Sequence, residues 1–169
     1  MKVKLQGCDG WTELVTLDIN GDHSPDVVHD LTVLPYPFAD DTFHQVHLYD
    51  VLEHLGQQGD YRTFFGQFAE FWRILKPGGF LVACSPGPMS RWAWGDPGHT
   101  RIMGQECLVF LDQRQYTEQV GKTPMTDYRF CYEADFAVAF SDVDRNGQHF
   151  YALEAVKPSR IVRPVREAA

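Results

Sequence analysis

A helix, a glycine turn and an apolar strand follow one another without a gap between Tyr61 and Cys84, and this succession constrains the fold more than any other stretch. Apolar side chains recur at steps of three and four residues from Tyr61 to Leu75, which predicts an amphipathic helix. Lys76–Gly79 ends that helix, because it combines a cation, a proline and two glycines. Phe80–Cys84 is almost wholly apolar, which is typical of a parallel strand buried on both faces.

Short runs of alternating or β-branched residues predict further strands on both sides of this unit. They cover Val3–Gln6, Leu14–Ile19, Asp26–Asp30, Thr42–Tyr49, Asp135–Phe140 and His149–Val156. The Asn146–Gly147 pair between the last two indicates a hairpin turn, and Asp50–Leu55 and Gln105–Tyr116 are predicted to be helical. This order predicts an α/β fold, with a mostly parallel sheet flanked by helices and a C-terminal antiparallel hairpin.

The chain has 169 residues, which suits one domain. We expect this domain to span residues 1–157 and a flexible basic tail to follow over residues 158–169. The formal net charge of −8 argues against bulk nucleic-acid binding, which needs clustered lysine and arginine. The apolar runs are too short for a membrane span, and the N-terminus does not read as a signal peptide. The four scattered cysteines are typical of a reducing, cytoplasmic environment, and no metal site stands out among the seven histidines.

Four sequence segments, in this order and at this spacing, carry a family resemblance. They read L-D-I-N from Leu17, H-D-L-x-x-L-P-Y-P-F from His29, Y-D-V-L-E-H-L from Tyr49, and F-W-R-I-L-K-P-G-G-F-L from Phe71. Together they resemble the middle of a class I S-adenosylmethionine-dependent methyltransferase of the small, type 11-like group. The resemblance implies a Rossmann-like methyltransferase fold and S-adenosyl-L-methionine as cofactor. The methyl acceptor is either a small molecule, which we expect, or a macromolecule.

The resemblance also implies roles for residues at the carboxyl ends of the strands, where ligands of such sheets bind. Asp18, with Ile19 beside it, is expected to hold the cofactor's ribose, although an aspartate before Asn-Gly is also a common turn former. Asp30 is expected to accept from the adenine amine, while Leu31 packs on the ring. Further predicted contacts come from the adenine wall, the glycine loop and the segment beneath the methionine half: Leu34, Pro35, Phe38, Gly7, Cys8, Tyr49 and Asp50.

Three residues are candidates for catalysis: His54, His99 and Arg101. A histidine near the acceptor can take a proton, since its pKa lies near neutrality, but either histidine can equally serve packing or loop order. Arg101, in the D-P-G-H-T-R segment, can clamp an anionic acceptor or pair with Asp96. Glu53 is expected to be a solvated helix residue.

An alternative function remains open, namely a methyltransferase-like module that binds or assembles without catalysis. Asp9 displaces the second glycine of the glycine loop, and few residues separate Gly10 from Asp18. That distance leaves no room for the helix that usually joins the first two strands, and the amino end of that helix would help to bind the cofactor's carboxylate.

Overall fold

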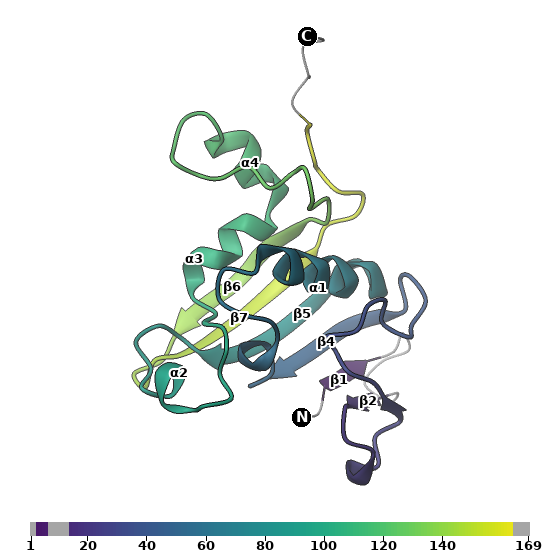
Figure 1. Cartoon of the computed structure of the whole chain (residues 1–169). Coiled ribbons are helices and arrows are strands. Elements are labelled where there is room, and N and C mark those ends of the chain that lie inside the picture. The colour runs from purple at the N-terminus through teal and green to yellow at the C-terminus, as the bar shows by residue number, and fades with distance from the viewer. Residues whose placement is uncertain (1–2, 7–13, 164–169) are drawn as a thin grey trace.

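The structure, a computed structural model, describes residues 3–6 and 14–163 and contains a seven-stranded sheet in the order β3-β2-β1-β4-β5-β7-β6 (Figure 1). The strands are β1 (Val3–Gln6), β2 (Leu14–Asp18), β3 (Val27–Val28), β4 (Phe43–Tyr49), β5 (Leu75–Pro86), β6 (Phe136–Val143) and β7 (Gln148–Ala155). The predicted α/β class and the C-terminal antiparallel hairpin are confirmed. Gly147, at φ 80°, supplies the left-handed residue that the hairpin turn requires.

Five strands point the same way, namely β2, β3, β4, β5 and β6, whereas β1 and β7 run antiparallel to them. The reversal of β1 places its carboxyl end, Gln6, away from the edge where the carboxyl ends of the parallel strands lie. Gln6 pairs with Leu14 and with Gln45, so β1 ends beside the amino ends of its neighbours. The cause is the short connection, because residues 7–13 cannot hold the crossover that parallel strands need.

One long helix, α1 (Tyr61–Ile74), lies across the middle of the sheet (Figure 1). Asp60 caps its amino end by accepting a hydrogen bond from the Thr63 N–H at 3.1 Å. Its buried apolar face consists of Phe65, Phe68, Phe71 and Ile74. The predicted helix over Tyr61–Leu75 is therefore confirmed apart from its last residue, which begins β5.

The predicted single helix over Gln105–Tyr116 is wrong. The chain instead forms α3 (Gln105–Leu108), the 3₁₀ turn η3 (Val109–Leu111) and α4 (Gln113–Gln119). Asp112 interrupts the helix because its backbone is extended and its side chain caps α4 by accepting from the Arg114 N–H. The remaining short elements are η1 (Gly21–His23), η2 (Leu52–His54) and α2 (Trp92–Gly95).

The buried apolar residues of the described chain form one connected cluster between the sheet and these helices. It joins α1 to the loop between α4 and β6 through aromatic contacts such as Phe65 with Tyr132, whose ring centroids lie 4.7 Å apart. The cluster continues onto β4, β5 and β7 through Leu48, Leu81 and Tyr151. No helix among the described residues is long and apolar enough to cross a membrane.

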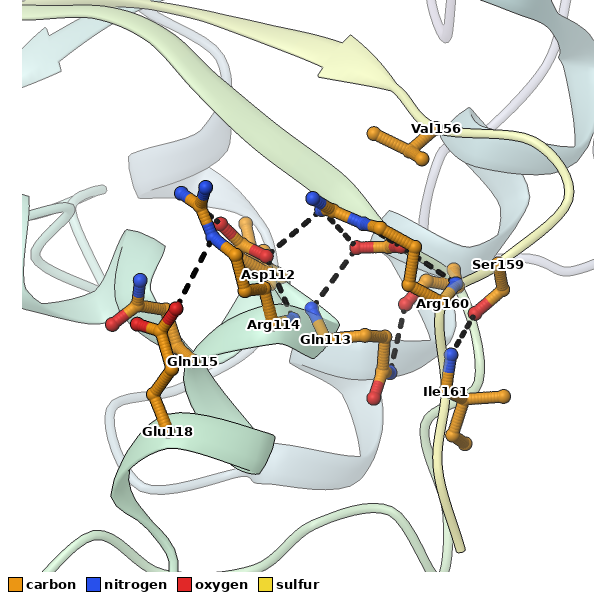
Figure 2. A network of polar contacts seen from close by, with 12 residues as sticks. Asp112, Gln113, Arg114, Gln115, Glu118, Val156, Ser159, Arg160 and Ile161 are labelled. Carbon is orange, nitrogen blue, oxygen red and sulfur yellow. Dashed lines mark hydrogen bonds and ion pairs between the residues drawn. The ribbon is translucent and has the colours of Figure 1, made fainter.

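The segment after β7 is held against the body as far as Arg163, unlike the flexible tail predicted over residues 158–169. The Arg160 side chain bonds to Asp135 through Nε and Nη2, and to Asp112 through Nη2 (Figure 2). Arg163 pairs with Glu133. Residues 164–169 lie outside the described part of the chain.

Candidate functional site

A cavity of about 260 Å³ opens where β2 and β3 end, at the edge of the sheet toward which most strands point. Five of the predicted site residues line it: Asp18, Ile19, Asp30, Leu31 and His54. The structure thus gathers the end of β2, the turn after β3 and the segment after β4 around one space, as expected for a ligand site of an α/β sheet.

Asp18 is the last residue of β2 and is only 1 % exposed. Its Oδ1 accepts a hydrogen bond from the Asn20 backbone N–H at 2.9 Å, and its Oδ2 accepts one from His23 Nδ1 at 3.0 Å. Burial by itself raises the pKa of this carboxyl, but these hydrogen bonds outweigh burial and hold the pKa well below its usual range. The cavity wall therefore carries an ionised carboxylate at neutral pH, and the same residue also forms the predicted turn.

Asp30 and Leu31 occupy the turn that follows β3. Asp30 Oδ1 accepts from both the backbone N–H and the hydroxyl of Thr32, each at 2.8 Å, and these bonds lower the pKa of Asp30. Leu31 is buried and belongs to both the core cluster and the cavity wall. A second carboxylate and an apolar side chain therefore lie together on the wall beside Asp18.

The predicted adenine wall of Leu34, Pro35 and Phe38 does not line this cavity, so its contact with the cofactor stays a prediction. Phe38 packs edge-on against Phe43 at the opposite end of β4, with ring centroids 4.9 Å apart. Arg73 holds the segment there by donating hydrogen bonds to the Phe38 and Tyr36 carbonyl oxygens.

Tyr49 and Asp50 lie after β4 but do not line the cavity. The Tyr49 hydroxyl bonds to His47 at 2.7 Å, and the Tyr49 side chain is half exposed. Asp50 adopts φ 51° and accepts a hydrogen bond from Gln148 Nε2 at 2.6 Å, which ties it to the hairpin. Their predicted contact with the cofactor stays a prediction, and Gly7 and Cys8 lie outside the described residues.

His54 and His99, the two predicted catalytic histidines, come together from distant parts of the chain. His54 ends η2 and His99 lies in the loop after α2; their ring centroids are 4.7 Å apart. His54 Nδ1 lies 3.0 Å from the Gly98 carbonyl oxygen, and His99 Nδ1 lies 2.8 Å from that of Trp92. A carbonyl only accepts, so each Nδ1 carries a proton and donates it to the carbonyl oxygen.

Glu53 is a correction to the sequence analysis, because it is only 1 % exposed rather than solvated. Neither of its carboxylate oxygens has a well-formed hydrogen bond among the described residues. The nearby Ser85 hydroxyl also has no well-formed hydrogen bond there. Burial raises the pKa of Glu53, and the Ser85 hydroxyl offsets this only in part. The available sequence signal was its position directly after the apolar pair Val51–Leu52 at the ligand edge.

Arg101 is also buried, and it does not pair with Asp96 as one alternative predicted. Its Nη2 donates to the Leu52 carbonyl oxygen at 3.0 Å and to Gln67 Oε1 at 3.1 Å. Arg101 lines a second cavity of about 200 Å³ beside the start of α1, walled by aromatic residues such as Phe64 and Tyr128. Its Nε and Nη1 have no described hydrogen-bond partner, so an anion clamp at Arg101 remains a prediction and would belong to this second cavity.

The loop between β5 and α3 exposes its tryptophans. Trp92 is 56 % exposed and Trp94 74 %, so they do not bury the loop. Trp94 Nε1 donates to the Pro88 carbonyl oxygen at 3.2 Å, which orders the loop from within. These aromatic surfaces stand beside His99 in the chain and remain available to a ligand or partner.

Comparisons with known proteins agree with this geometry. A family model described as a methyltransferase domain matches residues 4–83. A SAM-dependent methyltransferase from Archaeoglobus fulgidus has a similar structure, with a TM-score of 0.50 and 17% identity over 82% of this chain and 74% of that one. The N-methyltransferase NodS from Bradyrhizobium japonicum, in complex with S-adenosyl-L-homocysteine, has a TM-score of 0.46 and 14% identity over 82% of this chain and 64% of that one.

A third structure, a SAM-dependent methyltransferase from Methanosarcina mazei, has a TM-score of 0.44 and 18% identity over 83% of this chain and 80% of that one. No curated protein sequence matches the chain. At these identities the structural likeness bears on the fold, while the family match rests on the segment that contains Asp18, Asp30, Glu53 and His54. Residues 4–83 thus match the model of the methyltransferase-domain family, and the chain has the same α/β fold as the SAM-dependent methyltransferase from Archaeoglobus fulgidus.

Proposed function

We propose that the protein is an S-adenosylmethionine-dependent methyltransferase that acts on a small-molecule acceptor. The observation that carries the proposal is the cavity at the ends of β2 and β3, with Asp18 and Asp30 in its wall and His54 also lining it. The family match over the same segment supports this assignment.

The cavity lining fits the adenosine half of the cofactor. The ionised Asp18 carboxylate suits the two hydroxyl groups of a ribose. Asp30 takes its described hydrogen bonds on Oδ1, so Oδ2 can accept from an exocyclic amine, and Leu31 offers an apolar surface to the base. A volume of about 260 Å³ lies just below the roughly 300–1,000 Å³ of small-molecule sites, so it suits part of the cofactor rather than all of it.

When bound, S-adenosylmethionine supplies an activated methyl group, and the protein contributes mainly orientation and exclusion of water. In the metal-free protein, His54 and His99 would be the groups that take up the acceptor's proton. Because each Nδ1–H is occupied by a backbone carbonyl, Nε2 is the atom that can accept a proton from a hydroxyl or amine. Trp92 and Trp94 offer exposed aromatic surfaces to the acceptor in the same loop region.

Calorimetric titration with S-adenosylhomocysteine tests the cofactor site. We expect roughly micromolar binding by the unmodified protein. Binding should be weakened at least about tenfold by Asp18→Asn, since a charge-assisted hydrogen bond contributes about 1.5–3 kcal/mol. Asp22→Asn, an exposed neighbour in η1, is the matched control and should bind normally. Equal binding by Asp18→Asn and the unmodified protein would remove Asp18 from the site.

The second candidate function is a binding or assembly module without methyltransferase activity, and the reversed β1 is the observation that favours it. In this arrangement β1 ends at the edge of the sheet away from the cavity, whereas the carboxyl ends of parallel strands form the usual ligand edge. The same titration decides between the two. An absence of binding at millimolar S-adenosylhomocysteine would favour the module.

A further inference from the structure

We propose that Glu53, His54 and His99 bind a divalent transition-metal ion. One ligand atom from each of the three residues lies within 4.8 Å of the others, so a single ion can reach all three. Glu53 and His54 are adjacent in η2, directly after β4, and the loop after α2 brings His99 against them. This inference goes beyond the proposed methyl transfer, which by itself needs no metal.

The orientation of the two histidines is that of metal ligands. Metal-binding histidines usually donate their second ring N–H to a carbonyl or carboxylate, which holds the ring and selects the tautomer. His54 does so to the Gly98 carbonyl oxygen at 3.0 Å, and His99 to the Trp92 carbonyl oxygen at 2.8 Å. The carbonyl contacts occupy both Nδ1 atoms, so Nε2 is the ring atom that each histidine can offer to a metal ion.

Glu53 supplies the independent observation. Its side chain is buried, yet both carboxylate oxygens are without a hydrogen-bond partner among the described residues. Buried polar atoms are nearly always satisfied, and an uncompensated buried carboxylate is costly. A cation beside Glu53 would satisfy that charge directly, and backbone hydrogen bonds from Thr100 and Arg101 to the Glu53 carbonyl oxygen keep the residue in place.

Asp96 adds negative charge at the same place. Its Oδ2 lies 3.9 Å from His99 Nε2, which is too far for a hydrogen bond. A cation bound beside His99 would also be attracted to this carboxylate, with Asp96 as an outer partner.

The ligand set indicates the class of ion. Two imidazoles and one carboxylate suit Zn²⁺, Mn²⁺, Fe²⁺ or Co²⁺, whereas Mg²⁺ and Ca²⁺ prefer oxygen ligands throughout. Three protein ligands leave a coordination position for water or a substrate oxygen. Under the proposed function that position would orient a hydroxyl-bearing acceptor; this last point rests on the proposed function, whereas ion binding does not.

Zinc titration of chelator-treated protein, purified without a histidine tag, tests the site by calorimetry. We expect one ion per chain. Glu53→Gln and His99→Ala should each weaken binding at least about tenfold, the size of loss seen when even outer partners of a metal site are removed. His44→Ala and Cys131→Ser are the controls, because both side chains are exposed and lie outside the cluster; they should bind zinc normally. No binding, or equal binding by Glu53→Gln and His99→Ala, overturns the proposal.

Thermal unfolding with and without zinc gives a second measurement. Glu53→Gln removes a buried, unpaired charge, so the metal-free variant should be at least as stable as the unmodified protein. Zinc should raise the melting temperature of the unmodified protein but not that of Glu53→Gln. If Glu53→Gln does not fold, His99→Ala decides the question. Zinc binding without S-adenosylhomocysteine binding would overturn the proposed methyltransferase function and support the metal site. S-adenosylhomocysteine binding without zinc binding would overturn only the metal site.

Discussion

The two faces of the sheet differ sharply. One face is covered by α1 and the α3–α4 segment, and its side chains on β4, β5 and β7, such as Val46, Leu81 and Leu153, are fully buried. The described chain leaves the other face partly open. There Phe150 is 41% exposed, and Gln45, His47 and Tyr49 form a hydrogen-bonded row along β4.

The difference between the two faces follows from the length of the connections between strands. Parallel strands are usually buried on both faces because their crossover helices cover the sheet. Here β1 and β2 are joined without a crossover, and only η1 lies between β2 and β3. The expectation that Phe80–Cys84 is buried on both faces is therefore wrong for Phe80 and Val82, which are only half-buried.

The largest expected effect comes from a deletion on the covered face. Phe68→Ala should lower the free energy of unfolding by about 3–5 kcal/mol, because it opens a cavity in the core cluster. Phe150→Ala on the open face should cost about 1 kcal/mol or less. Urea unfolding of both variants measures the contrast, and equal losses would mean that the open face is covered in solution.

The next effect concerns the ion pairs that attach α4 to the segment after β7. Arg160→Met leaves the buried Asp135 carboxylate without its cation and leaves Asp112 with Arg114 alone, so we expect a loss of about 2–3 kcal/mol (Figure 2). Arg163→Met removes an exposed pair with Glu133 and should cost at most about 0.5 kcal/mol. Thermal denaturation compares the two variants; similar losses would show that Arg160 does not hold α4 to the hairpin.

A smaller effect should appear as a pH dependence on the covered face. Burial lowers the pKa of His149 below 6.5, and the Met103 carbonyl and Glu106 offset this in part. As the pH falls below 6.5, His149 is protonated in the unfolded chain before it is protonated in the folded chain, so the free energy of unfolding decreases. His149→Gln should flatten this decline relative to His44→Gln, as followed by urea midpoints across acid pH. Parallel curves for the two variants would exclude His149 as the cause.

The smallest effect is expected for the row on the open face. His47 Nε2 donates to Gln45 Oε1 at 2.8 Å, so its Nδ1 accepts from the Tyr49 hydroxyl. Tyr49→Phe removes one solvent-accessible hydrogen bond and should change the free energy of unfolding by about 0.5–1 kcal/mol. A loss of several kcal/mol would mean that this row is buried by another segment.

Local patterns predicted the elements whose stability comes from neighbours in sequence. The helix α1, the strand β5 and the hairpin β6–β7 follow from helical periodicity, a glycine turn and the Asn146–Gly147 pair. The direction of β1 did not follow, because alternation indicates a strand but not its orientation. The break at Asp112 was missed since a capping aspartate competes with helix propensity only once the following turn is formed.

The candidate site was predicted in the same uneven way. Asp18, Asp30, Leu31 and His54 follow their strands closely, so motif order placed them at one edge. The burial of Glu53 depends on the loop around Thr100, whose N–H bonds to the Glu53 carbonyl oxygen across a long stretch of chain. Contacts between such distant residues produce no periodic pattern in the sequence, so the burial of Glu53 could not be predicted. The same reason applies to the burial of Arg101.

The reversed β1 has a consequence for how the chain folds. A crossover would pair β1 with a strand far along the chain, whereas only seven residues separate β1 from its partner β2 in the sequence. Short loops cost little closure entropy, and hairpins form within microseconds. We expect this pair to assemble early and to dock onto β4 as a unit, so the amino-terminal edge of the sheet lowers the contact order of the whole domain.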